Sequence, residues 1–397
     1  MPIFLFLKQL VDMFYQYQIL DYGMVLFALI LLGYGIIKNK LYLKWKEYIC
    51  ISDLIVIALA VVYIGSWIRY PAAYGIFFKI ESAILLYFIG RVYGRQIMSY
   101  GRWLAWAGYI VIYANFVYRF YQFNCKFILH GPEVTLLNVG GLYYYKTDLA
   151  VGVIIAVLFI YMFSESKILK WITIIPIAGY TVFYSGARMG QVVMAVEYGC
   201  ILFHEIENKY GKEWIMPEKI VKRIMTVLIG AVVLFFVFLQ VFSFEQFANS
   251  HDIATGAGSL LEKLMHSRQI IWWDILNYFS EQPVLTRIFG IDLQTEYMHN
   301  MAGMRAHSTY IKQIYATGYV GSMLFVSFCA DIVCRITRES DGRLRYIVLI
   351  LWVMLLGSGL SIESMESTQM SWFPMLYAGV LVSSTGITDQ HKILESR

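Results

Sequence analysis

The chain has 397 residues, of which 59% are hydrophobic and only 15% are charged. A soluble domain needs far more polar surface, so this composition excludes a soluble protein and indicates a polytopic membrane protein. The net charge of +5 is too small to indicate a nucleic-acid partner, and the five cysteines show none of the paired spacings of a metal site.

Apolar segments long enough to cross a bilayer recur along the chain. About 20 mostly apolar residues span the hydrocarbon core. Residues 1–20 are partly amphipathic, and we expect them to form a helix that lies at the membrane interface. The candidate spans after it are residues 21–37, 47–66, 73–90, 103–119, 147–164, 168–184, 189–204, 223–242, 312–331, 345–361 and 371–386. The expected fold is therefore an all-α, polytopic integral membrane protein with about 11–12 transmembrane helices.

The distribution of Lys and Arg predicts the orientation of these spans. If the spans simply alternate, five basic connecting segments and the C-terminal tail fall on one side of the membrane. They include "KNKLYLKWKEY", "ENKYGKEWIMPEKIVKR" and "CRITRESDGRLR", and together they hold most of the 32 Lys and Arg residues. Cytoplasmic loops are enriched in these cations, so this side is predicted to be the inside.

One long segment, residues 243–311, falls on the outer side. Apolar residues recur at helical spacing within it, at Leu261, Leu264, Ile271 and Ile275, so we expect one or two helices packed on the membrane domain. The predicted organisation has three parts: N-terminal transmembrane helices in 1–242, an extracytoplasmic loop in 243–311, and C-terminal transmembrane helices with a short cytoplasmic tail in 312–397.

A few cationic residues fall on the predicted outer side, where the enrichment of Lys and Arg in cytoplasmic loops does not explain them. Arg188 follows a tight turn in "YSGARMGQ", where its planar guanidinium either binds two phosphate oxygens or anchors the span. Arg268 precedes Trp272 by four residues and either stacks on that indole or is solvated. His307 and its neighbour Arg305 stand at the entry of span 312–331, where a histidine is either structural or reactive.

Three segments carry a family resemblance. They are "YSGARMGQVVMAVEYG" (184–199), "SRQIIWWDILNYFSEQPVLTRIFGI" (267–291) and "AHSTYIKQIYATGYVGSMLF" (306–325). In this order and at these topological positions, they resemble motifs of the bacterial O-antigen and capsular polysaccharide polymerase and O-antigen ligase superfamily. The chain departs from the family pattern at Ser308, where many relatives have Asn, and at Gly190, which is displaced from the usual position after Arg188.

The resemblance implies a GT-C-type glycosyltransferase of the bacterial cytoplasmic (inner) membrane, with its active site facing the periplasm or the exterior. Its substrate would be an undecaprenyl-pyrophosphate-linked oligosaccharide, used without a metal or another cofactor. By motif position, His307 would be catalytic, and Arg188 and Arg268 would bind the pyrophosphate. A chain-length regulator and a flippase would be its protein partners in the bilayer, and no nucleic acid is expected.

Several other residues are assigned lesser roles. The candidates for supporting residues of the site are Arg305, Tyr310, Trp272, Glu363 and Glu366. The remaining loop histidines, His251, His266 and His299, are expected to lie outside the site. Lys79, Glu81 and Glu197 are ionisable residues within predicted spans, so each is by default a candidate for a functional role that the sequence does not specify.

The favoured function is polymerisation of lipid-linked repeat units into capsular, O-antigen or exopolysaccharide chains. One alternative is an O-antigen ligase, which would transfer the finished glycan to a different acceptor and shares the same motifs. A second, from a different class, is a transporter or flippase of lipid-linked sugars, although the chain shows no internal repeat. A non-enzymatic assembly scaffold would leave the outer Arg and His residues unexplained.

Overall fold

The computed structural model describes residues 1–14, 17–40, 49–125, 141–143, 145–183, 185, 187–210, 268–360 and 362–395. Of these residues, 86% are helical, and none lies in a strand. The α-helices are α1 (Pro2–Val11), α2 (Gln18–Lys38), α4 (Ile51–Arg69), α5 (Tyr74–Tyr93), α6 (Gly101–Cys125), α7 (Lys146–Phe163), α8 (Lys167–Ile172), α9 (Gly179–Phe183), α10 (Arg188–Tyr210), α14 (Arg268–Ser280), α15 (Val284–Phe289), α16 (Thr309–Arg338), α17 (Gly342–Ser358) and α18 (Thr368–Glu395). The expectation of an all-α protein is confirmed for the described part of the chain.

Five helical stretches are long and apolar enough to cross a membrane: Ile19–Lys38, Ile51–Arg69, Pro71–Tyr118, Lys146–Phe163 and Thr309–Arg338. This supports a membrane-embedded protein. The predicted spans that lie within the described residues all fall on helices, whereas span 223–242 lies outside those residues.

Predicted span 168–184 is an interrupted helix rather than a continuous one. Between α8 and α9, residues 173–178 form a π-helix that contains Pro176. Proline has no backbone N–H, and its ring clashes with the preceding turn, so the wider π turn accommodates it. The apolar composition of this segment predicted its location but not the break.

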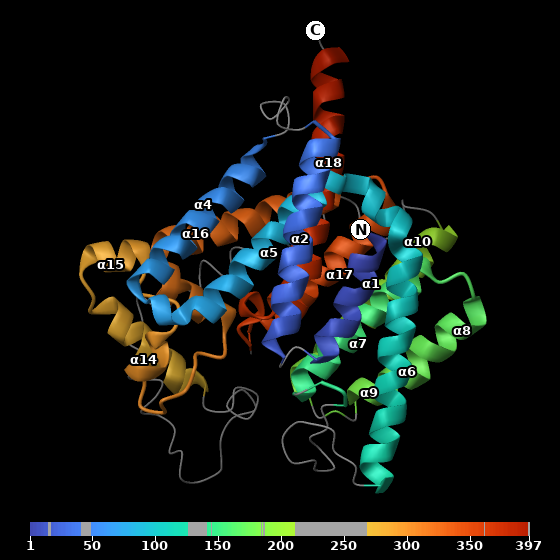
Figure 1. Ribbon diagram of the computed structural model, residues 1–397, viewed down its shortest axis with the longest axis horizontal. Helices are drawn as coiled ribbons and strands as arrows, with labels where there is room; N and C mark the ends of the chain where they lie inside the picture. Colours follow the sequence, from blue (N-terminus) through green and yellow to red (C-terminus); the bar gives the residue numbers. More distant parts are fainter. Residues whose placement is uncertain are drawn as a thin grey trace.

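The N-terminal helix α1 packs within the helical assembly, between α2 and α6 (Figure 1). Phe4 and Leu5 are completely buried, and the ammonium of Lys8 lies 4.4 Å from the ring centroid of Trp372 in α18. The location of this helix at the membrane interface stays a prediction. Part of α1, including Phe4, Leu5 and Lys8, is thus buried against its neighbours, whereas Ile3 and Leu7 are exposed.

Two small residues let α5 and α18 approach closely. A Cβ atom on Gly90 would lie 2.0 Å from the carbonyl oxygen of Leu376, and one on Gly379 would lie 2.0 Å from that of Tyr87. Small residues at helix crossings allow such backbone contact in membrane proteins. The crossing fixes the C-terminal helix α18 against the N-terminal half of the chain.

Helix ends that were predicted to share the cytoplasmic side contact one another. Arg91 at the end of α5 binds Asp53 at the start of α4, with Nε 2.8 Å from Oδ1. Arg95 pairs with Glu339, which follows α16, at 2.9 Å. These ion pairs join segments that simple alternation of the spans places on the same side.

Helix α16 is kinked at Gly318, which has a positive φ of 64° inside the helix. The kink frees two backbone carbonyls, and both find new donors. The carbonyl of Tyr315 accepts the backbone N–H of Ile291 at 2.8 Å, and that of Ala316 accepts the hydroxyl of Ser66 at 2.7 Å. The kink thus lets α15 dock against α16, where the two helices lie side by side in Figure 1.

Candidate functional site

Charged side chains gather around the segment before α16, which is hydrogen-bonded both to α14 and to Glu363, the residue before the short 3₁₀ helix Ser364–Glu366. We call this set the charged cluster; its members are Arg268, Glu296, Arg305, His307, Lys312, Glu363 and Glu366. It contains one of the two predicted pyrophosphate ligands, the predicted catalytic histidine and three of the predicted supporting residues.

His307 is the more exposed residue of the pair that it forms with Glu363. Its side chain is 36% exposed, whereas that of Glu363 is 8% exposed. The backbone N–H of His307 donates to Oε1 of Glu363 at 2.7 Å, and Nδ1 lies 3.8 Å from Oε2. The imidazole therefore has a carboxylate behind it and remains open to an incoming group.

A second carboxylate, Glu366, links two cations. Its Oε2 lies 3.3 Å from the guanidinium of Arg305, and its Oε1 lies 3.6 Å from the ammonium of Lys312. Lys312 also contacts Oε1 of Glu296 at 2.5 Å. Lys312 and both glutamates are buried, whereas the side chain of Arg305 is 41% exposed. The buried carboxyls of Glu296 and Glu366 thus both lie beside the ammonium of Lys312, and the side chain of Arg305 reaches the surface.

The position of Arg268 depends on the helix that it begins. One turn later in α14, the indole N–H of Trp272 donates to the carbonyl of Ala306 at 2.6 Å. That bond fastens α14 to the residue directly before His307. Burial lowers the pKa of the Arg268 guanidinium, while the nearby carboxylate of Glu363 opposes the shift. Glu363 therefore contacts His307 and lies close enough to Arg268 to influence its guanidinium.

Burial shifts the pKa of two acidic members, Glu296 and Glu366. It raises the pKa of Glu296 to about 7, although the ammonium of Lys312 opposes this shift. Burial also raises the pKa of Glu366, against the effects of Lys312 and Arg305. For Arg305, burial lowers the pKa, but Glu366 and Glu363 outweigh it and leave the pKa raised. The guanidinium of Arg305 stays charged, while the carboxyls of Glu296 and Glu366 hold a proton more tightly than usual.

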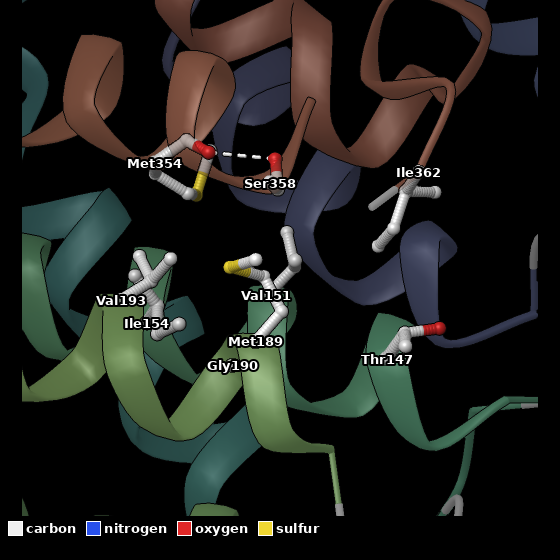
Figure 2. Close-up of a pocket in the computed structure, with 9 residues that line it drawn as sticks. All are labelled: Thr147, Val151, Ile154, Met189, Gly190, Val193, Met354, Ser358 and Ile362. Atoms are coloured by element: carbon white, nitrogen blue, oxygen red, sulfur yellow. Dashed lines mark hydrogen bonds between the residues drawn. The ribbon is translucent and has the colours of Figure 1, made fainter. Parts of the chain in front are cut away.

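Arg188 is the first residue of α10, and its side chain is outside the described set. The backbone next to it can be placed. Met189 and Gly190 line a small pocket together with Ile362, the residue directly before Glu363 (Figure 2). The start of α10 therefore lies across this pocket from the segment that leads into the charged cluster.

The pocket itself is apolar. Its lining comes from α7, α10, α17 and the segment after α17: Thr147, Val151, Ile154, Met189, Gly190, Val193, Met354, Ser358 and Ile362. The hydroxyl of Ser358 already donates to the carbonyl of Met354 at 2.6 Å (Figure 2). The pocket therefore suits an apolar group better than a phosphate or a sugar.

Two other predicted residues have structural partners. The hydroxyl of Tyr310 donates to the carbonyl of Leu356 at 2.6 Å and so ties the start of α16 to α17. His299 stacks on Tyr278, with ring centroids 3.6 Å apart. His251 and His266 lie outside the described residues.

Three residues with long-range contacts in this region were not predicted from the sequence: Lys312, Glu296 and Arg69. Lys312 begins a predicted span, and an ionisable residue at that place is itself a signal for a functional role. Arg69 ends α4 and donates to the carbonyls of Phe289 and Gly290, so a cation at an outer helix end was a usable signal as well. Nothing in the sequence around Glu296 indicated a functional role, because its contact with Lys312 forms only when the loop folds.

The ionisable residues within the spans differ in their relation to the cluster. Lys79 in α5 lies close enough to lower the pKa of Glu366. Glu197 in α10 is 1% exposed, and neither carboxylate oxygen has a hydrogen-bond partner within the described part of the chain. Among the described residues, no group of His, Cys, Asp and Glu side chains is arranged to hold a metal ion.

No protein-family model matches this chain, and no curated protein matches it. The resemblance of the three sequence segments therefore remains a prediction.

Proposed function

We propose that this chain is a GT-C-type membrane glycosyltransferase that polymerises undecaprenyl-pyrophosphate-linked oligosaccharides on the outer side of the bacterial cytoplasmic membrane. The observation that supports the proposal is that Arg268 and His307 both lie near the carboxylate of Glu363. These two residues come from separate motifs, 39 positions apart in the sequence.

The cluster has the groups that the reaction needs. A sugar hydroxyl of the acceptor attacks the anomeric carbon of the donor as the bond to the pyrophosphate breaks. His307 accepts the hydroxyl proton, a contribution of about 10²–10⁴-fold for a well-placed base. Arg268, with Arg188 at the start of α10, stabilises the charge that develops on the leaving pyrophosphate without a metal.

Polymerase and ligase would share this chemistry and differ in the acceptor. A polymerase transfers to another lipid-linked repeat unit, whereas a ligase transfers to a different molecule. We favour the polymerase because the outer segment 243–311 is moderate in size, which leaves little chain for binding a second, unrelated acceptor.

One observation favours a transporter instead. Glu197 is a buried carboxylate in a helix that we expect to span the membrane, and such residues often mark ion or substrate pathways. The cations of the charged cluster, however, belong to the ends of helices and to the loop segments between them. The proposal therefore assigns the reaction to the cluster and leaves Glu197 outside it.

The test uses purified protein in detergent with an undecaprenyl-pyrophosphate-linked oligosaccharide as the only substrate. The proposal predicts a ladder of longer lipid-linked glycans. Elongation that appears only after a non-lipid-linked acceptor is added would identify a ligase. Substrate that remains unchanged in detergent but crosses the bilayer of a proteoliposome would contradict the enzyme and support the transporter.

A further inference from the structure

His307 has an uncommon backbone conformation. Its φ is 47°, and among the described non-glycine residues only Lys40 shares a positive φ. Such a conformation costs about 1–3 kcal/mol and persists only where the surroundings hold it. The contacts around His307 therefore show what fixes the imidazole in place.

Glu363 makes two contacts with this one residue. Its Oε1 accepts the backbone N–H of His307 at 2.7 Å, a normal hydrogen-bond distance. Its Oε2 lies 3.8 Å from Nδ1, which is close enough for an ion pair but too long for a direct hydrogen bond. The same carboxylate therefore holds the backbone and faces one of the two ring nitrogens.

The segment that carries Glu363 is itself fastened to the start of α16. The hydroxyl of Thr309 donates to the carbonyl of Ile362 at 3.0 Å and accepts the backbone N–H of Ser364 at 2.7 Å. The backbone N–H of Thr309 donates to the carbonyl of Gly359 at 2.8 Å. These bonds flank Glu363 on both sides, so the carboxylate is held against His307.

We propose that Glu363 is the positioning residue of His307: it fixes the backbone, and its negative charge beside Nδ1 favours the ring proton on that nitrogen, so that Nε2 is the nitrogen that accepts the proton. This inference rests on the proposed function for its role in transfer. As the acceptor hydroxyl attacks, its proton moves to Nε2, and the pyrophosphate leaves with the electron pair of the broken bond. The carboxylate then faces the imidazolium that forms, as in hydrolytic triads.

Glu366 provides a matched control in the same loop. It is also a buried glutamate, but it contacts Arg305 and Lys312 rather than His307. A substitution of glutamate by glutamine removes the same charge at either position. Only at position 363 does it remove the negative charge that faces Nδ1.

The experiment records nitrogen NMR spectra of protein carrying ring-labelled histidine, in detergent and without substrate, at an alkaline pH where a histidine ring is neutral. The variant His307→Gln identifies the signal of His307. In the wild-type protein, we expect the Nδ1–H tautomer to predominate. In Glu363→Gln, it should shift to the Nε2–H tautomer, while Glu366→Gln leaves the wild-type pattern unchanged.

An Nε2–H ring in the wild-type protein, or a wild-type pattern in Glu363→Gln, would overturn the inference. An equal shift in Glu366→Gln would also overturn it, because the effect would then come from the charge of the loop. The measurement needs no substrate, so it is independent of the elongation assay. A tautomer shift in a protein that elongates nothing would leave the contact intact and refute only the proposed function.

Discussion

At the scale of single residues, the proposed role of Arg268 depends on the shape of its guanidinium as well as on its charge. A planar fork binds two phosphate oxygens at once, whereas an ammonium acts as a point charge. We expect Arg268→Lys to lower the rate of glycan transfer by about 10-fold or more, which corresponds to one lost charge-assisted hydrogen bond. The rate of elongation of a lipid-linked oligosaccharide by purified protein measures this effect.

Arg343→Lys is the matched control for this substitution. Arg343 is exposed at the start of α17, on the predicted cytoplasmic side, so the same chemical change there should leave the rate unaltered. A wild-type rate in Arg268→Lys would refute the two-oxygen contact.

Glu296 predicts a dependence of stability on pH. Burial raises the pKa of its carboxyl from 4.5 to about 7. Between these values the unfolded chain releases the proton and the folded protein keeps it, so the folded state loses stability as the pH rises. Glu296→Gln has no proton to release. Its free energy of unfolding relative to wild type should therefore rise by roughly 3 kcal/mol between pH 4.5 and about pH 7. Thermal unfolding followed by tryptophan fluorescence measures it, and parallel curves for the two proteins would contradict the prediction.

At the scale of elements, the kink in α16 and the end of α15 depend on one another. A Cβ atom on Gly318 would lie 2.4 Å from the backbone nitrogen of Gly290 and 2.5 Å from the carbonyl oxygen of Ile288. Both contacts are with backbone, which cannot move aside without undocking α15. The positive φ of Gly318 adds a further cost to any other residue.

We therefore expect Gly318→Ala to lower the melting temperature markedly. The matched control is Gly303→Ala, because Gly303 has a similar φ of 59° but no atom within 4 Å of its Cβ position. That variant has only the conformational cost of about 1 kcal/mol. Equal melting temperatures for the two variants would show that the docking of α15 does not depend on the close approach.

At the scale of the whole molecule, α16 connects the two predicted sides of the membrane. Its 30 residues rise about 45 Å, enough to cross a bilayer despite the kink. Met301, which is 89% exposed, precedes the helix, and exposed Cys334 lies near its other end. In cells that carry one cysteine at a time, an impermeant maleimide should label Met301→Cys directly but Cys334 only after permeabilisation. Labelling of Cys334 in intact cells would contradict the orientation.

The helices could be predicted from the sequence for a definite physical reason. Long apolar runs and the placement of Lys and Arg are local properties, so they can be read without knowing the tertiary contacts. The pairing of Lys312 with Glu296, and of Arg69 with the carbonyl of Gly290, depends on how the loop folds over α16. The positive φ of His307 was hidden as well, because no residue type in "RAHSTY" requires it.

The central claim is that His307 performs the transfer step of a polymerase. The direct measurement is a gel of glycan chains, together with the pool of lipid-linked repeat units, in a host that lacks the native gene and expresses either wild-type protein or His307→Ala. We expect His307→Ala to reach the membrane, to form no ladder and to accumulate single lipid-linked repeat units. A ladder unchanged from wild type would contradict the claim and the mechanism built on it.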